Sequence, residues 1–232
     1  MTAASLLARR RHSIGLVIFD CDGVLVDSEL VANTVVADIL SASGWPMTPE
    51  QAEQRFVGLN IEAMVPIIET HLRRPLPSDW VDRVTAALVE TLGRESRAIP
   101  GAAEALHALN AASLPWRVAS NSSHLEMHAK FACLGMTALV AGRLHSYEDV
   151  PRGKPAPDLF LATAAAAGIA PDQCVVIEDS VVGARAAAAA GMDCLGYAPH
   201  GDGAALRLAG AAMFRSMFDL PALLAAAPGM AR

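Results

Sequence analysis

The fold is decided by the stretch Gly15-Leu-Val-Ile-Phe-Asp20-Cys-Asp22-Gly23. Its apolar run breaks into two carboxylates and a glycine, which is typical of a buried strand that ends at the ligand-binding edge of an open α/β sheet. Because side chains alternate along a strand, Asp20 and Asp22 share a face. Two carboxylates in one site repel each other unless a positive group lies beside them, and a divalent cation would serve. An ordinary polar turn after a core strand is the alternative interpretation.

Composition describes a globular protein that is poorly suited to nucleic acid. The 232 residues are 53% hydrophobic and 18% charged, enough for one large domain with a smaller insertion, and the formal net charge is −6. We expect the basic run at residues 9–11 to be a solvated arm. No segment reaches the roughly 18 apolar residues of a membrane span. At the N-terminus the arginines follow the small apolar patch, whereas in a secretory signal the basic residues come first. We therefore expect a cytoplasmic protein that binds neither nucleic acid nor membranes. As a separate expectation, the protein is a monomer.

Apolar runs alternate with alanine- and leucine-rich helical patterns over most of the chain. Strands are expected at residues 15–19, 116–119, 174–177 and 194–197, and helices at 102–111, 124–133, 157–167 and 181–190. The alternation predicts a Rossmann-like, three-layer α/β core with a parallel central sheet. Four cysteines lie far apart in or near apolar segments, and we expect buried thiols rather than disulfides.

One segment interrupts the alternation. Residues 31–41, 61–71 and 81–92 show only helical patterns, separated by breakers at Gly44-Trp45-Pro46 and Pro75-Leu76-Pro77. We expect an α/β core domain of residues 1–29 and 98–232 and a small all-helical cap domain of residues 30–97. Such an insertion would form a lid over the end of the first strand.

Further polar groups stand just after apolar runs or at loops that enter helices: Ser120, Asn121, Lys154, Glu178 and Asp179. Each has an ordinary alternative, such as a helix cap or an exposed loop lysine. The carboxyl ends of parallel strands meet at one edge of the sheet, so these groups would gather around Asp20 and Asp22. Phosphoryl transfer requires this kind of positioning and charge neutralisation.

In these motifs the chain resembles the haloacid dehalogenase superfamily of aspartate-nucleophile phosphotransferases. Residues 20–29 match its first motif, Ser120-Asn121 the second, Lys154-Pro155 the third and Glu178-Asp179-Ser180 the fourth. The resemblance extends over residues 14–223. It points to the branch with a helical cap of the C1 type, which includes β-phosphoglucomutases and phosphoglycolate phosphatases.

The resemblance implies roles for these residues. Asp20 would attack phosphorus to give an aspartyl phosphate, and Asp22 would protonate the leaving oxygen and then activate water. The phosphoryl oxygens would be held by Ser120, Asn121 and Lys154. Mg²⁺ would be bound by Asp20, Asp179 and the backbone carbonyl of Asp22, with Glu178 as an additional or outer ligand. The presence of Asp22 favours phosphorus over carbon as the atom attacked.

The cap distinguishes the alternatives that remain. Mutases of this branch carry a cap arginine that grips a second phosphate, and here Ile61 stands in its place, although Arg55 could substitute. Candidate substrate residues in and near the cap are Ser28, Arg55, Gly58 and Asn60. We expect a Mg²⁺-dependent phosphatase acting on a small phosphorylated metabolite such as a sugar phosphate. A β-phosphoglucomutase-like phosphotransferase is the alternative, and a catalytically silent binding protein of the same fold is a further one.

Overall fold

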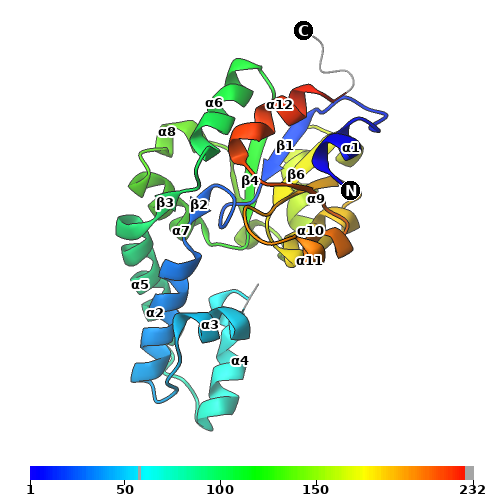
Figure 1. The fold of residues 1–232 in the computed structure, drawn as a ribbon. Helices are drawn as coiled ribbons and strands as arrows, with labels where there is room; N and C mark the ends of the chain where they lie inside the picture. The colour runs from blue at the N-terminus through cyan, green and yellow to red at the C-terminus, as the bar shows by residue number, and fades with distance from the viewer. Residues whose placement is uncertain (57–58, 228–232) are drawn as a thin grey trace.

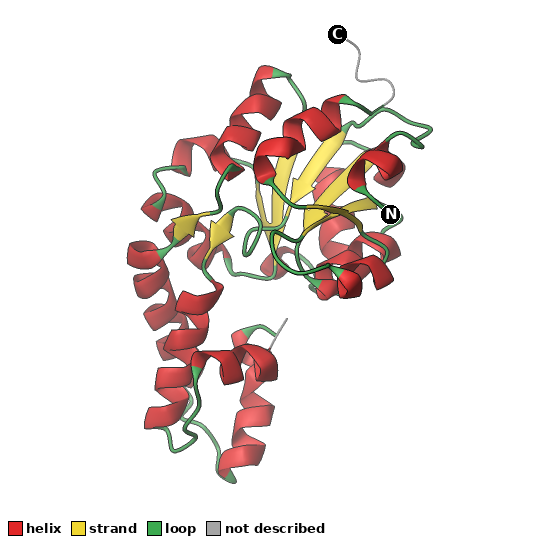
Figure 2. Ribbon diagram, in the orientation of Figure 1, coloured by secondary structure: helices red, strands yellow, loops and turns green. Residues whose placement is uncertain are grey.

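The computed structural model describes residues 1–56 and 59–227 and is built around a six-stranded parallel sheet (Figures 1 and 2). The strand order is β5-β4-β1-β6-β7-β8. The strands are β1 (Leu16–Phe19), β4 (Trp116–Ser120), β5 (Leu144–Ser146), β6 (Cys174–Glu178), β7 (Asp193–Tyr197) and β8 (Ala212–Phe214). The first strand lies between β4 and β6, so the residues that follow it emerge near the middle of the sheet edge.

The alternation of side chains along β1 divides the core into two layers. Val17 and Phe19 pack into one apolar cluster, and Leu16 and Ile18 into the other. Helices on the first face are α1 (Ala3–Leu7), α6 (Ala102–Ala111), α7 (His124–Cys133), α8 (Thr137–Val140) and α12 (Leu220–Ala225). The opposite face is covered by α9 (Asp158–Ala166), α10 (Val181–Ala189) and α11 (Ala204–Leu208). The expected three-layer α/β fold with a parallel sheet is confirmed.

Between β1 and α6 the chain leaves the core as a helical insertion. Its helices are α2 (Glu29–Ala42), α3 (Pro49–Phe56), α4 (Ile61–Leu72) and α5 (Trp80–Glu95). They surround an apolar cluster of their own that includes Leu40, Phe56 and Ile68. The short antiparallel pair β2 (Val26–Asp27) and β3 (Arg97–Ala98) lies where the chain leaves and returns (Figure 2). Every described element from Glu29 to Glu95 is helical, including α3, which its polar sequence did not reveal.

Two expectations need correction. The basic run at residues 9–11 is not wholly solvated, because the side chain of Arg10 is only 3% exposed. Its guanidinium pairs with the carboxylate of Asp193 and donates to the carbonyl of Asp172 at 2.8 Å. Among the cysteines, Cys133 is only partly buried, whereas the other three are buried thiols.

Three short 3₁₀ helices complete the described elements: Tyr147–Asp149, Pro171–Gln173 and Met217–Asp219. None of the helices in the described part of the chain combines the length and the apolar character that crossing a bilayer would require.

Candidate active site

The polar residues singled out in the sequence gather at the carboxyl edge of the sheet. Asp20 follows β1, and its backbone N–H donates to the carbonyl of Ile177 in β6 at 2.9 Å. The register between β1 and β6 therefore places Asp20 beside Glu178, the last residue of β6. Ser120 ends β4 on the other side. Strands far apart in sequence thus deliver their polar ends to one place, as the parallel topology requires.

Lys154 lies between two of these carboxylates. Its ammonium is 2.8 Å from Asp20 Oδ1 and 2.7 Å from Glu178 Oε1, and it also lies 4.8 Å from the centre of the Phe160 ring. Burial opposes the charge of Lys154, but the carboxylates of Asp20 and Glu178 outweigh it and raise the pKa of this lysine. Lys154 is therefore a fixed positive charge at the bottom of the site.

Glu178 is fully buried and satisfied by several donors. Besides Lys154, the backbone N–H of Ser180 donates to its carboxylate at 3.1 Å and the hydroxyl of Ser180 at 2.8 Å. The carboxylate has room only because residue 183 is a glycine. A Cβ at Gly183 would lie 1.7 Å from Glu178 Oε1. Glu178 thus acts as the anchor of Lys154.

Asp20, Glu178 and Asp179 form an acidic cluster whose oxygens lie within 4.8 Å of one another. Burial and then the charge of Glu178 raise the pKa of Asp20 to about 7, although Lys154 acts in the opposite direction. Burial, Glu178 and Asp20 raise the pKa of Asp179 well above its usual range. A cation among the three carboxylates would relieve this repulsion. Because all the candidate ligand atoms are oxygens, the cluster fits a hard divalent ion.

The glycine after the aspartate pair makes this cluster possible. Gly23 has a φ of +72°, and a Cβ there would lie 1.9 Å from Asp179 Oδ2. The backbone at Gly23 therefore turns in a left-handed conformation and approaches the Asp179 carboxylate more closely than any other residue would permit.

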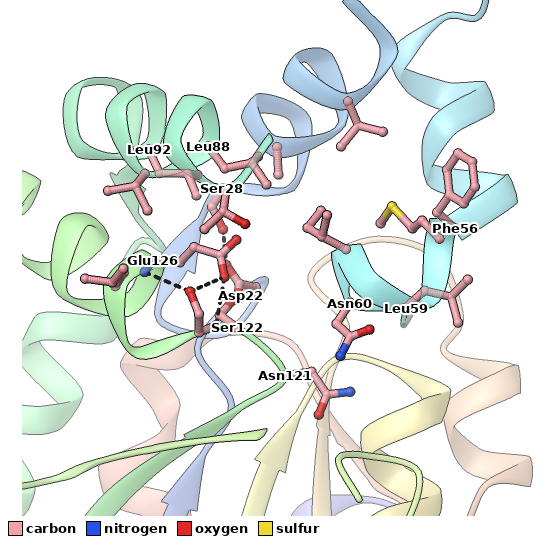
Figure 3. A pocket seen from close by; sticks show the side chains of 18 of the residues that line it. Asp22, Ser28, Phe56, Leu59, Asn60, Leu88, Leu92, Asn121, Ser122 and Glu126 are labelled. Atoms are coloured by element: carbon pink, nitrogen blue, oxygen red, sulfur yellow. Dashed lines mark hydrogen bonds between the residues drawn. The ribbon is translucent and has the colours of Figure 1, made fainter. Parts of the chain in front are cut away.

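Asp22 is surrounded by a separate set of side-chain hydrogen-bond donors (Figure 3). Lys130 Nζ is 2.6 Å from its Oδ1, and the hydroxyl of Ser122 donates to its Oδ2 at 2.8 Å. The hydroxyls of Ser28 and Ser120 donate to it as well, the latter at 3.3 Å. Burial works against the charge, but Lys130 and these hydrogen bonds outweigh it and lower the pKa of Asp22. Each aspartate of the pair therefore has its own buried lysine.

Lys130 was not found from the sequence. It lies on α7, where a lysine four residues from the helix end looks like an ordinary surface residue, yet it is only 2% exposed. One signal was present: the chain has only two lysines, Lys130 and Lys154, against 16 arginines. Both lysines bind the aspartates of the first motif.

Asn121 connects two of the expected motifs. Its side-chain amide donates to the carbonyl of Lys154 at 3.0 Å and accepts from the N–H of the same residue at 2.9 Å. The side chain thus holds the loop that carries Lys154, while the preceding Ser120 accepts from the N–H of Ser122 at 3.0 Å. The helix cap after β4 is Ser123, which leaves Ser120 in the site.

A cavity of about 590 Å³ opens above Asp22, between the core and the helical insertion. Ser28, Asn60 and Asn121 line it, together with apolar side chains such as Phe56 and Leu88 (Figure 3). Asn60 also caps α4 by accepting from the N–H of Ala63.

The other two candidate cap residues are not found in this cavity. Arg55 lines a different hollow, and its guanidinium lies 5.6 Å from the centre of the Trp45 ring. Gly58 lies outside the described residues, so its predicted part in substrate binding stays a prediction. The structure thus brings Ser28 and Asn60, but not Arg55, to the cavity.

The fold and the charged residues gathered at its sheet edge are those expected of an α/β enzyme. The chain belongs to the haloacid dehalogenase-like hydrolases, since the model of that family matches residues 14–191. The expected family and enzyme class are confirmed.

Two named relatives and a solved structure support the same family. The chain is 32% identical to 6-phosphogluconate phosphatase of Escherichia coli, over 81% of this chain and 85% of that protein. It is also 32% identical to hexitol phosphatase B of the same species, over 75% and 79%. A crystal structure of a haloacid dehalogenase family hydrolase from Deinococcus radiodurans, with bound phosphate and sodium, is 36% identical. It covers 94% of this chain and 97% of that one, with a TM-score of 0.72.

Proposed function

We propose that this protein is a Mg²⁺-dependent phosphatase that hydrolyses a small phosphorylated metabolite. The observation that carries the proposal is the pair of aspartates, each bound by a buried lysine, beside an acidic cluster and below a cavity. The two E. coli relatives are named as phosphatases of small phosphorylated compounds, which supports the same class of reaction here. We further propose that it acts as a cytoplasmic monomer.

In the proposed first step, a carboxylate oxygen of Asp20 attacks phosphorus. The bond from phosphorus to the alcohol oxygen breaks, and Asp22 gives that oxygen a proton. Asp22 must therefore enter this step protonated, away from the ion pair with Lys130 that lowers its pKa. In the second step water attacks the phosphorus of the aspartyl phosphate, Asp22 takes a proton from the water, and the bond to Asp20 breaks to release inorganic phosphate. The covalent intermediate divides one difficult step into two easier ones.

Charge on the transferred oxygens would be balanced by fixed groups. The ammonium of Lys154, the hydroxyl of Ser120 and backbone N–H groups near Asp22 and Asn121 would hold the phosphoryl group. Mg²⁺, held by the carboxylates of Asp20 and Asp179 and the carbonyl of Asp22, would supply further positive charge beside the phosphoryl group. Glu178 is committed to Lys154 and Ser180, which supports an outer position for it.

We propose that residues 30–97 form a cap domain over a core of residues 1–29 and 98–232. The separate apolar cluster of the insertion and the two-stranded junction support this division. A contact between the two parts joins the hydroxyl of Tyr147 to the carboxylate of Glu62 at 3.4 Å. Movement about the junction would open and close the cavity to substrate.

Hydrolysis is favoured over the mutase alternative by the position of Arg55. A mutase must grip the second phosphate of a sugar bisphosphate, and in this structure the guanidinium of Arg55 faces Trp45 instead. The silent binding protein is disfavoured because the nucleophile, the acid/base residue and both lysines are present.

The test is release of phosphate from p-nitrophenyl phosphate, with Mg²⁺ and with EDTA, by the natural protein and by Asp20→Asn. We expect turnover only with Mg²⁺ and a loss of roughly 10⁴-fold in Asp20→Asn, because no intermediate can form. Asp38→Asn, at an exposed position of α2, is the matched control and should retain full activity. Turnover that survives in Asp20→Asn would contradict the mechanism. Conversion of glucose 1-phosphate to glucose 6-phosphate in the presence of the glucose bisphosphate would instead support the mutase alternative.

A further inference from the structure

The walls of the cavity above Asp22 are strongly acidic. Apart from Asp22 itself, six carboxylates line the cavity: Glu29, Glu53, Glu62, Asp82, Glu126 and Glu148. The first four come from the four helices of the insertion, and the last two come from the core. Asp22, two residues from Asp20, lines this space, so we expect a substrate whose phosphate lies at Asp20 to project the rest of its structure into it.

Some of these acids are already engaged. Glu126 accepts from the N–H and hydroxyl of Ser123 in a capping box, and Glu148 accepts from the N–H of His124 at 2.7 Å. Glu62 accepts from Tyr147. These hydrogen bonds leave the negative charge of each carboxylate in place, because all the donors are neutral.

The other three wall acids are free of such contacts. Within residues 1–56 and 59–227, no side-chain hydrogen bond or ion pair engages Glu29, Glu53 or Asp82. Desolvation raises the pKa of Glu29, and the charges of Asp22 and Glu53 raise it further. The negative charges at this side of the cavity therefore lie close enough to repel one another.

Positive charge is scarce in the cavity. Lys130 is the one cationic side chain among the described lining residues, and its ammonium is bound by Asp22 and Ser122. Arg55 faces Trp45, and the two cap residues outside the described part, Val57 and Gly58, have uncharged side chains. A second anionic group on a substrate would have to take Lys130 from Asp22 or remain unpaired beside the acids.

We infer that this cavity selects phosphate monoesters whose alcohol portion carries no second anionic group, namely neutral polyols and amine-bearing alcohols. The inference rests on the proposed phosphatase function and specifies its substrate class. Carboxylates accept hydrogen bonds from hydroxyls and attract ammonium groups, whereas they repel a carboxylate or a second phosphate. Apolar side chains of the same wall, such as Phe56 and Leu88, would contact the carbon skeleton.

The test compares substrates that differ at one group. Sorbitol 6-phosphate and 6-phosphogluconate are linear six-carbon monoesters that differ in a hydroxymethyl or a carboxylate at C1. We expect kcat/KM to be about tenfold or more higher for sorbitol 6-phosphate at low ionic strength, since a carboxylate would lie near several like charges. Glucosamine 6-phosphate should exceed glucose 6-phosphate by a smaller factor. Both ratios should shrink as salt is added, because solvent-exposed charges are screened.

Variants assign the effect to the wall. Glu29→Gln combined with Glu53→Gln should shift the kcat/KM ratio toward 6-phosphogluconate by roughly three- to tenfold. The matched control is Glu90→Gln on α5, an exposed glutamate that pairs with Arg94 and does not line the cavity. It should leave the ratio unchanged.

The outcomes separate this inference from the proposed function. Equal or higher kcat/KM for 6-phosphogluconate, or a preference that the double variant leaves intact, would overturn the inference while phosphatase activity stands. Absence of Mg²⁺-dependent turnover of p-nitrophenyl phosphate would overturn the proposed function. In that case calorimetric binding of the same two monoesters to the natural protein decides the selectivity, and tighter binding of 6-phosphogluconate would overturn it.

Discussion

The core and the helical insertion face the same cavity, but they differ in whether their carboxylates are paired with other side chains. In the core, Asp20 and Asp22 are each bound by a buried lysine, and each of these two carboxylates makes at least two contacts. On the insertion, four acids line the wall, and only Glu62 among them has a described side-chain partner. The chain places both of its lysines in the core site and none in the insertion.

This difference separates two tasks. A reaction on phosphorus needs charges that are fixed before the substrate arrives, because reorganising them during the reaction would cost free energy. Selection among alcohols needs only that the wrong ones be repelled, and exposed acids on the wall of the cavity can do that. Substitutions in the core should therefore affect every substrate alike, and substitutions in the insertion should affect substrates unequally.

Among the substitutions that test this contrast, the largest effect is expected from Lys154→Met, which removes the cation between Asp20 and Glu178. We expect kcat to fall by about a thousandfold for every substrate. Leaving Glu178 buried without its ion pair should also lower the free energy of unfolding by about 3 to 5 kcal/mol. Urea unfolding and aryl phosphate turnover measure both.

Arg152→Met in the same loop is the matched control for Lys154→Met, because Arg152 is an exposed arginine that pairs with Asp158. It should change neither stability nor turnover appreciably. Near-normal stability in Lys154→Met would contradict the view of this lysine as the partner that Glu178 requires.

Next in size is Lys130→Met, which leaves Asp22 with hydroxyl donors only. We infer that Lys130 positions Asp22, so kcat should fall by roughly 10- to 100-fold while KM changes little. In the background of Asp22→Asn the same substitution should cost nothing further, because the residue that it positions is already lost.

A spectroscopic readout is available because the chain has two lysines. Protein labelled with ¹³Cε-lysine should give two side-chain resonances, and Asp22→Asn should shift the Lys130 signal more than the Lys154 signal. If Lys130→Met instead lowered kcat by the same factor in the Asp22→Asn background as in the natural protein, Lys130 would have a merely structural role.

The contrast between the two lysines also explains how far the sequence could predict the structure. Lys154 stands in a loop beside a proline and matches a family motif, so its role could be expected. Lys130 lies on a helix whose other buried residues, Met127 and Phe131, already account for its apolar face. The local sequence pattern of this helix does not indicate that Lys130 contacts Asp22, which is 108 residues away in sequence.

The same reasoning applies to the fold. The four strands with long apolar runs and most of the helices were predicted within a residue or two, because burial on both sides produces a strong local signal. Strands β5 and β8 have three residues each, and α3 is largely polar, so their positions depend on contacts with neighbours rather than on their own composition. The acidic wall was not predicted, since its members come from six separate elements.

A smaller effect is expected from Gly183→Ala, which tests whether the anchor of Lys154 is as rigid as the contacts imply. The added Cβ would overlap the Glu178 carboxylate, so we expect a loss of about 1 to 3 kcal/mol in stability and a decrease in kcat for all substrates. Gly93→Ala on α5 is the control, since its Cβ would lie 3.7 Å from that of Ala129. It should stabilise the protein by about 0.5 to 1 kcal/mol, because alanine favours a helix interior.

The smallest effect is expected from Arg55→Ala on the insertion. Its guanidinium lies 5.6 Å from the centre of the Trp45 ring and does not line the cavity, so kcat/KM for sorbitol 6-phosphate should change less than twofold. Asn60→Ala is the comparison, because Asn60 lines the cavity and caps α4, and its loss should raise KM more for sorbitol 6-phosphate than for p-nitrophenyl phosphate. A fall of fivefold or more in Arg55→Ala, confined to substrates with a second phosphate, would mean that this arginine turns into the cavity when the cap closes. The insertion would then carry a cation after all, the contrast with the core would weaken, and the mutase alternative would regain its missing phosphate grip.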